Sequence, residues 1–152
     1  MAAPELQSDE PIAGDAAAMA RILGEAGVTR DRLVRVTGRA GLTAVFWLCR
    51  AGWAQAAYVH PKWIPGMPAA AALLIPHPCR PDELIGLLHG AAMPKGRLLI
   101  VQAGSEAPGA GENGFAAALA SLGYRVEGHI FDGVHQVYIA RSRGLPRLRQ
   151  AA

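Results

Sequence analysis

The sequence has few cysteines, few charged residues and no apolar run long enough to cross a membrane. Two cysteines in 152 residues provide no disulfide framework. The longest apolar stretches break at Arg50 and at Pro76, so none reaches the ~20 residues that a transmembrane helix needs. The first residues also lack the basic and then apolar pattern of a signal peptide. We therefore expect a soluble, cytoplasmic protein with no membrane partner.

Several motifs that identify a reaction are also missing. The sequence contains no phosphate-binding Walker loop, no Cys-x-x-Cys pair, and no Ser, His and Asp in an order typical of hydrolases. Its tryptophans, Trp47, Trp53 and Trp63, are not interleaved with basic residues, so a surface that stacks on nucleic-acid bases is not indicated. No motif in the chain therefore names a chemistry by itself.

The composition is that of one globular domain, because 51% of the residues are hydrophobic and only 18% are charged. The net charge of +3 comes from the C-terminal end, which carries four arginines: Arg141, Arg143, Arg147 and Arg149. We expect a disordered segment over 1–8, a single domain over 9–143 and a basic tail over 144–152. We expect no nucleic-acid binding except through these arginines, and a solvated terminus is the alternative interpretation.

The segment Leu33–Gly52, which reads LVRVTGRAGLTAVFWLCRAG, organises the rest of the chain. An apolar strand over Leu33–Thr37 leads through a glycine turn to Gly41, and an apolar helix follows over Leu42–Ala51. A strand, a tight turn and a helix form the opening unit of a doubly wound α/β domain. The helix is apolar on nearly all sides, so we expect it to be buried or covered by a partner, such as a second copy of the chain.

Apolar periodicity predicts the other elements. A first helix begins at Asp9 or after Gly14-Asp15 and stops at Gly27, and further helices cover Asp82–Ala92 and Phe115–Leu122. Strands cover Gln55–His60, Ala70–Pro76, Arg97–Gln102, Tyr124–Phe131 and His135–Arg141, the last two joined by a hairpin turn at Asp132-Gly133. Lys62–Pro68 is predicted to be a loop, and the glycine-rich Ala103–Gly114 a flexible loop and candidate lid. The predicted fold is α/β and doubly wound, with a mostly parallel sheet of about six strands, an antiparallel C-terminal hairpin strand and helices on both faces.

Three stretches resemble the class I S-adenosylmethionine-dependent methyltransferases. Leu33–Gly41 is similar to the first strand and glycine loop of that family. Ala72–Gln102, with Pro81-Asp82-Glu83-Leu84 and Met93-Pro94-Lys95-Gly96, is similar to its strand–helix–turn–strand segment, and Leu122–Ile139 to its last helix end and reversed strand. The resemblance covers roughly residues 31–143 and implies the family's seven-stranded, Rossmann-like sheet with one antiparallel strand. One strand–helix pair is absent here, because 61–68 is too short to hold it.

Two departures from the family's pattern fall on its cofactor site. The glycine loop of the family begins with an acidic residue, whereas Arg35 or Val36 stands near that position here. The carboxylate that usually holds the ribose hydroxyls is replaced by His60. A neutral imidazole cannot accept two hydrogen bonds together, and losing a charge-assisted bidentate contact costs about 1.5–3 kcal/mol, or roughly ten- to a hundredfold in affinity. We expect S-adenosylmethionine to bind weakly or not at all.

The candidate ligand site lies beyond the carboxyl ends of the strands, where open α/β sheets bind their ligands. The candidate cofactor-binding residues at that edge are Gly38, Arg39, Gly41, His60, His77 and Gln102. Arg39, beside a helix N-terminus, is suited to hold an anion, and a solvated loop arginine is the alternative.

The catalytic residue is not identified by the sequence. His77 follows a strand end and is a candidate general base, but no carboxylate is obviously placed to orient it. Asp82 and Glu83 are interpreted as first-turn charges of a helix. His60, His77 and Cys79 are of metal-ligating types, yet His-x-Cys is a poor metal spacing, so we expect no metal site.

Two functions are compatible with this pattern. The first is a non-catalytic or regulatory methyltransferase-like module with a degraded cofactor site, which binds a partner protein, a second copy or a small molecule. The alternative is a small, divergent S-adenosylmethionine-dependent methyltransferase, in which the Gly38–Gly41 loop and His60 contact the cofactor.

Overall fold

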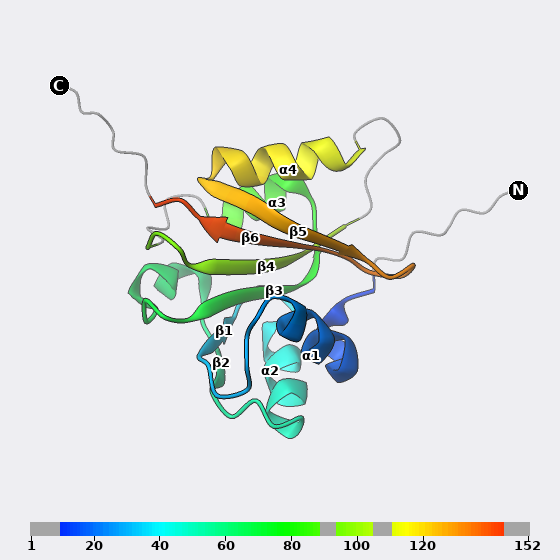
Figure 1. Cartoon of the computed structure of the whole chain (residues 1–152), viewed down its shortest axis with the longest axis vertical. Helices are drawn as coiled ribbons and strands as arrows, with labels where there is room; N and C mark the ends of the chain where they lie inside the picture. The colour runs from blue at the N-terminus through cyan, green and yellow to red at the C-terminus, as the bar shows by residue number, and fades with distance from the viewer. Residues whose placement is uncertain (1–9, 89–93, 105–110, 145–152) are drawn as a thin grey trace, which may run out of the picture.

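The computed structural model describes residues 10–88, 94–104 and 111–144. The segment predicted to be disordered (1–8), the middle of the predicted lid, and the arginines Arg147 and Arg149 lie outside the described residues. The described chain forms one six-stranded sheet with helices packed against it, as Figure 1 shows. This arrangement confirms the predicted α/β class.

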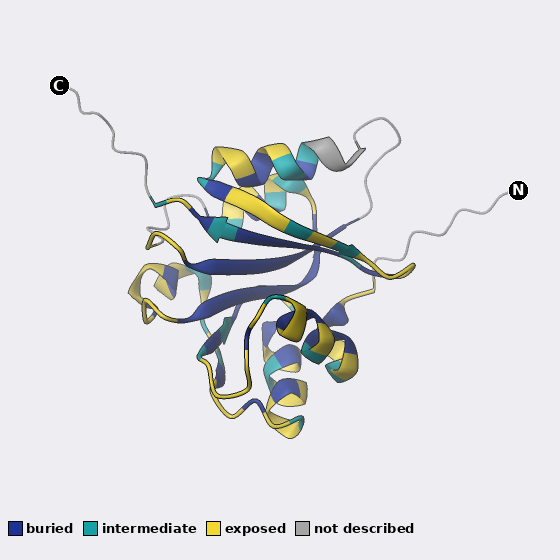
Figure 2. Cartoon of the chain, in the orientation of Figure 1, coloured by how far each residue is buried: buried dark blue, intermediate teal, exposed yellow. Residues whose placement is uncertain are grey.

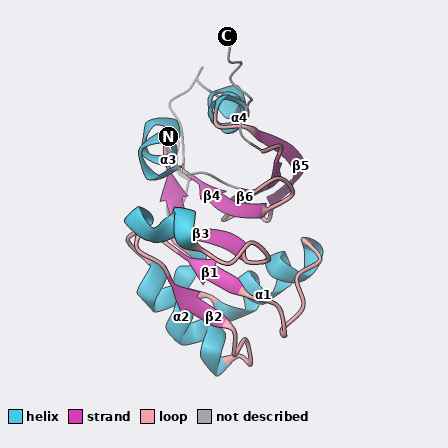
Figure 3. Cartoon of the chain, turned by 90° about the vertical axis from the view of Figure 1, so that its left-hand side faces the viewer, coloured by secondary structure: helices cyan, strands magenta, loops and turns pink. Residues whose placement is uncertain are grey.

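The sheet is parallel except for one strand. Its six strands are β1 (Val34–Val36), β2 (Ala56–Tyr58), β3 (Ala72–Cys79), β4 (Leu98–Ala103), β5 (Tyr124–Phe131) and β6 (Gln136–Ser142). They lie in the order β2-β1-β3-β4-β6-β5, which Figure 3 shows from bottom to top. β2, β1, β3 and β4 pair in parallel, whereas β6 is antiparallel to both of its neighbours. A mostly parallel sheet with one reversed strand is what the methyltransferase resemblance implies, and the strand order confirms that architecture.

Helices cover both faces of the sheet. The α-helices are α1 (Ala16–Glu25), α2 (Gly41–Arg50), α3 (Pro81–Leu88) and α4 (Gly111–Ser121), and two 3-10 helices are η1 (Ile12–Gly14) and η2 (Pro61–Gly66). α1 and α2 pack on one face, α3 and α4 on the other. Successive side chains of β3 point to opposite faces of the sheet. Leu74 therefore packs in the core under α1 and α2, while Leu73 and Ile75 pack in the core under α3 and α4. With both faces covered, β3 and β4 are buried along their whole length, as Figure 2 shows.

Three element boundaries differ from the sequence prediction. β3 continues beyond Pro76 to Cys79, so His77 lies within a strand rather than in a loop after one. The segment predicted to be a loop over 62–68 contains most of η2, which begins at Pro61, where a missing N–H costs nothing. The third difference is α4, which begins within the predicted lid. α1 begins after Asp15, which is the second of the two predicted starts, and the Asp15 carboxylate accepts the Ala18 amide at 3.0 Å.

The helix α2 is less buried than its composition predicts. Ala44 and Leu48 are completely buried, but Leu42 is 69% exposed and Phe46 is 52% exposed. The apolar outer face is therefore not covered by the described part of this chain, and cover by a partner or a second copy stays a prediction. No helix among the described residues combines the length and the apolar character needed to cross a membrane.

The strand order reverses beside β1. From β1 the chain passes through α2 to β2 on one side, and it then returns past β1 to β3 on the other side. Between β2 and β3 the chain has η2 and no further strand, which confirms the predicted absence of one strand–helix pair. Ligands of open α/β sheets bind at such a reversal, so the sheet places the candidate site between β1 and β3.

Two of the four C-terminal arginines belong to the described chain, and one of them is part of the sheet. Arg141 lies in β6, pairs with Glu127 at 3.1 Å and donates to the Gly96 carbonyl at 3.2 Å. Arg143 is exposed just after β6, and its backbone amide donates to the Gly123 carbonyl. Binding of nucleic acid through the C-terminal arginines stays a prediction.

The β5–β6 turn is held by the carboxylate of Asp132. Its Oδ1 accepts the backbone amides of Val134 at 2.9 Å and His135 at 2.6 Å, and its Oδ2 lies 3.1 Å from both the His135 ring and Arg21. Burial raises the pKa of this carboxyl, but the hydrogen bonds from the His135 and Val134 amides and from the His135 ring outweigh it and hold the pKa well below its usual range.

We expect D132N to lower the free energy of unfolding at pH 7 by about 1–2 kcal/mol, because the amide keeps the acceptor but loses the charge. A carboxyl with a depressed pKa stabilises the fold above its unfolded pKa of about 3.9, and that stabilisation is lost as the pH falls towards the folded pKa. The difference between the two proteins should therefore shrink progressively below pH 4. Urea unfolding at pH 7, 4 and 2.5 measures it, and a constant difference would contradict the assignment.

Candidate functional site

A crevice lies where the strand order reverses. Its lining comes from the β1–α2 loop, the end of β2, the start of η2, the end of β3 and α3. It consists of Gly38, Arg39, Tyr58, Pro61, His77, Glu83, Gly86 and Leu87. Its volume is about 540 Å³. Small-molecule sites typically measure roughly 300–1,000 Å³, so the crevice is of a size to hold a ligand.

His77 reaches the crevice because β3 continues through two prolines. Ile75 pairs with Val101 and Cys79 pairs with Ala103, so the register shifts between Ile75 and Cys79. Proline offers no N–H to a ladder and is tolerated in strands at such irregularities, which explains Pro76 and Pro78 in a buried strand. The strand resumes pairing at Cys79, and His77 stays buried with only 2% of its surface exposed.

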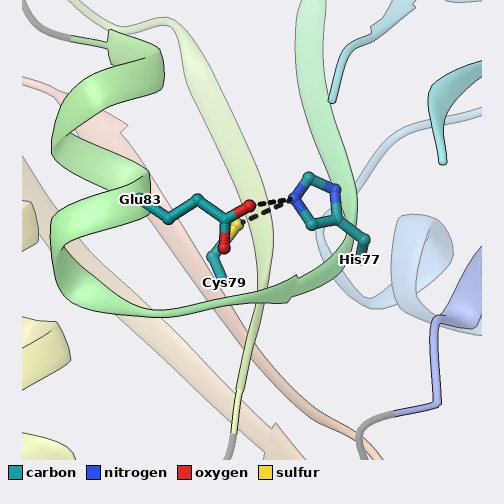
Figure 4. Close-up of side chains that lie close together, drawn as sticks. All are labelled: His77, Cys79 and Glu83. Atoms are coloured by element: carbon teal, nitrogen blue, oxygen red, sulfur yellow. Dashed lines mark hydrogen bonds and ion pairs between the residues drawn. The ribbon is translucent and has the colours of Figure 1, made fainter. Parts of the chain in front are cut away.

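The side chains of His77, Cys79 and Glu83 converge, as Figure 4 shows. The Nε2 atom of His77 lies 3.3 Å from Oε2 of Glu83 and 3.4 Å from Sγ of Cys79. Glu83 is in the first turn of α3, and side chains of a helix point back towards its N-terminus. The carboxylate therefore reaches back over the end of β3.

Arg39 holds the same carboxylate from the other side of the crevice. Its Nη1 pairs with Oε2 of Glu83, and its Nη2 donates to the Pro78 carbonyl at 3.2 Å. The guanidinium lies largely in solvent, with 62% of the side chain exposed, so it remains accessible to an anion that enters the crevice. Anion binding by Arg39 stays a prediction.

The environment keeps both His77 and Cys79 neutral near pH 7. Burial lowers the pKa of the His77 imidazole, and the charge of Arg39 adds to this, while Glu83 opposes both. Burial also raises the pKa of the Cys79 thiol to about 12, with a further contribution from Glu83. The Nδ1 atom of His77 is buried and has no hydrogen-bond partner, so it is the ring atom open to accept a proton when Glu83 binds Nε2.

Two glycines of the β1–α2 loop are already in close contact with protein side chains. A Cβ atom on Gly38, which has φ +97°, would lie 2.3 Å from Cε1 of His77. A Cβ atom on Gly41 would lie 2.8 Å from the ring of Tyr58. The space beside the two glycines, which a ligand could otherwise approach, is therefore filled by the rings of His77 and Tyr58.

The structure brings some of the sequence-predicted residues together and separates others. Gly38, Arg39 and His77 line the crevice, and Gly41 lies directly behind Tyr58. His60 follows β2, but its Nδ1 accepts the Lys62 amide at 3.1 Å and so caps η2. Gln102 is outside the crevice, where its side-chain amide binds the main chain of Ile12 and Glu10 at 2.9 and 2.8 Å.

Asp82 and Glu83 lie in the first turn of α3, as predicted, but the statement that no carboxylate is placed to orient His77 is wrong. Glu83 contacts both His77 and Arg39. The signal in the sequence was the spacing: when a helix begins two residues after a strand end, its first turn lies over that end. The buried cluster is thus able either to hold a proton on His77 or to offer nitrogen, sulfur and oxygen ligands to a metal ion.

Comparisons with known proteins found similar solved structures only. No family model matches the chain, and no curated protein matches it. The structure titled EvdMO1 has a TM-score of 0.43 and 16% identity, over 86% of this chain and 41% of that chain. A release factor-specific protein-(glutamine-N5) methyltransferase from Alicyclobacillus acidocaldarius has a TM-score of 0.43 and 14% identity, over 92% of this chain and 99% of that chain.

A third structure, a variant of the 16S rRNA (adenine(1408)-N(1))-methyltransferase from Catenulisporales acidiphilia, has a TM-score of 0.46 and 15% identity, over 93% of this chain and 100% of that chain. At such TM-scores these likenesses carry no argument about this chain. This chain spans less than half of EvdMO1. The architecture therefore rests on the strand order itself, and the site on its own geometry.

We expect G38A to destabilise the fold more than G133A. Both glycines have positive φ, +97° and +91°, so both substitutions carry a backbone penalty of roughly 1–2 kcal/mol. Only at Gly38 does the new methyl group meet a side chain, His77, which adds about 1–3 kcal/mol of overpacking. Urea unfolding measures both variants. H77A should recover part of the loss in the G38A background, and no recovery would contradict the predicted contact.

Proposed function

We propose that this chain is a small, divergent S-adenosylmethionine-dependent methyltransferase that binds its cofactor in the crevice between β1 and β3. The observation that carries the proposal is the position of the crevice. It lies at the carboxyl ends of the strands, beside the glycine loop that resembles that of the family, in a sheet with the family's single reversed strand. Methyl transfer needs a bound sulfonium donor and a nucleophile held in line with its methyl group.

The lining offers groups of the right chemistry for such a donor. Arg39 and the N-terminus of α2, which has no side-chain cap, are suited to a carboxylate. Tyr58 and Leu87 offer apolar surface to an aromatic base. His77 is the candidate base for the acceptor, because its ring is neutral and it lines the crevice beside Glu83.

The affinity for the cofactor is expected to be low. His60 stands where the family carries a carboxylate, and its ring nitrogen is engaged in capping η2. The ribose hydroxyls of the cofactor would then lack the charge-assisted hydrogen bonds that a carboxylate provides, as the sequence predicts.

We expect H60D to tighten S-adenosylmethionine binding by about tenfold or more, because it places a carboxylate where the family resemblance puts the ribose hydroxyls. H60N is the matched control, since Asn and Asp both cap a helix well but only Asp is charged. Isothermal titration calorimetry of the wild type and both variants measures the effect. Equal affinities for H60D and H60N would contradict the predicted ribose position.

We expect G86L to weaken S-adenosylmethionine binding by about tenfold or more without loss of stability. Gly86 lines the crevice on α3, and a Cβ atom there meets nothing within 4 Å, so the leucine side chain has room to enter the crevice. Replacing a helical glycine also removes its entropic cost. The matched control is G24L on α1, which is equally unhindered and lies outside the crevice. Titration calorimetry measures the affinity of each variant for S-adenosylmethionine, and thermal melts measure its stability. Equal affinities of G86L and G24L would contradict a cofactor site in this crevice.

A non-catalytic module is the second candidate function. It is favoured by one observation: the open sides of Gly38 and Gly41 are occupied by the rings of His77 and Tyr58. If neither S-adenosylmethionine nor S-adenosylhomocysteine gives heat or a thermal shift at about millimolar concentration, this second function replaces the first.

A further inference from the structure

We propose that His77, Cys79 and Glu83 form a binding site for one divalent metal ion of the zinc class, at the floor of the crevice. The expectation of no metal site weighed His77 and Cys79 without Glu83, which the start of α3 brings to them. The proposal does not depend on methyl transfer, since it concerns ligand atoms that the fold has already gathered. Figure 4 shows the three side chains pointing toward one another.

The two separations from His77 Nε2 match the edges of a metal-centred tetrahedron. Zinc binds histidine nitrogen and carboxylate oxygen at about 2.0–2.2 Å and thiolate sulfur at about 2.3 Å. With tetrahedral angles, nitrogen and oxygen ligands then lie about 3.4 Å apart, and nitrogen and sulfur ligands about 3.5 Å apart. The observed separations are 3.3 Å from His77 to Glu83 and 3.4 Å from His77 to Cys79. All three ligand atoms lie within 4.8 Å of one another.

Hydrogen bonding explains the same arrangement less well. Nε2 of His77 has at most one proton, and it lies almost equally far from the carboxylate and from the sulfur. A charge-assisted N–H···O⁻ bond is about 2.7–2.9 Å long, shorter than the 3.3 Å found here. A cation between the three atoms would satisfy the His77 nitrogen, the Cys79 thiolate and the Glu83 carboxylate together.

The kinds of ligand decide which metal fits. Imidazole, thiolate and carboxylate together suit Zn²⁺ and its spectroscopic substitute Co²⁺, whereas Mg²⁺ and Ca²⁺ take oxygen ligands. A thiolate and a carboxylate together neutralise a divalent ion, and Arg39 adds one positive charge on the solvent side of Glu83. Three protein ligands leave a fourth position, which is the pattern of zinc sites that bind an exchangeable molecule.

The surroundings fix the ligands and define the open side. Cys79 is completely buried, while His77 and Glu83 line the crevice, so the fourth position faces the crevice. Arg39 pairs with the carboxylate of Glu83 and with the Pro78 carbonyl, and thereby holds the ligand in place. The bound ion would meet any small molecule that enters between β1 and β3.

Titration with Co²⁺ tests the site directly. Protein kept reduced and stripped with a chelator should bind about one equivalent, with the strong visible bands of tetrahedral Co²⁺ and a near-ultraviolet thiolate-to-metal band. Zn²⁺ should displace the Co²⁺ and should raise the melting temperature of the metal-free protein. No cofactor is present in this titration, so failure of the proposed methyl transfer leaves the result unaffected.

Variants assign the ligands. C79S should abolish the near-ultraviolet band, whereas C49S, the matched control at the other cysteine, should leave it unchanged, because Cys49 is exposed on α2 away from the cluster. E83Q should weaken Co²⁺ binding by about tenfold or more, and its partly exposed position keeps the fold intact if C79S unfolds. Absence of tetrahedral bands in the folded wild type, or a band lost in C49S and kept in C79S, would overturn the proposal.

Discussion

The candidate site depends on one backbone constraint: the buried strand β3 continues through Pro76 and Pro78 instead of ending at the first proline. Each proline withholds an N–H from the ladder, and the register with β4 shifts between Ile75 and Cys79 to accommodate them. The strand then pairs again at Cys79, which carries His77 and Cys79 into the interior as neighbours. α3 begins two residues later, so its first turn adds Glu83 to the same place.

Much of the fold could be predicted from periodicity, because the central strands β3 and β4 are buried on both faces and contain continuous apolar runs. The strand Tyr124–Phe131 has the predicted bounds, and the predicted hairpin follows it, with its turn closed between Asp132 and His135, one residue later than the predicted Asp132-Gly133 centre. The end of β3 could not be predicted in this way, since proline is usually a strand terminator and only tertiary pairing with β4 overrides that preference.

The candidate site was partly predictable from the positions of the strand ends. Strand ends mark the ligand edge of an α/β sheet, and this principle selected Gly38, Arg39 and His77, which line the crevice. It also selected Gln102, which instead anchors the N-terminal segment through Ile12 and Glu10, because sequence position does not reveal which side of the sheet edge is already covered. Glu83 was missed because an acidic residue in a first helical turn has a sufficient local explanation.

The absence of one strand–helix pair also determines which strand lies at the edge of the sheet. β2 becomes the terminal strand, and it pairs over only Ala56–Tyr58. Exposed edge strands are templates on which other chains add strands, and a short edge strand offers such a chain few backbone groups for pairing. The short outer strand β2 therefore gives the sheet an end that resists edge-to-edge association.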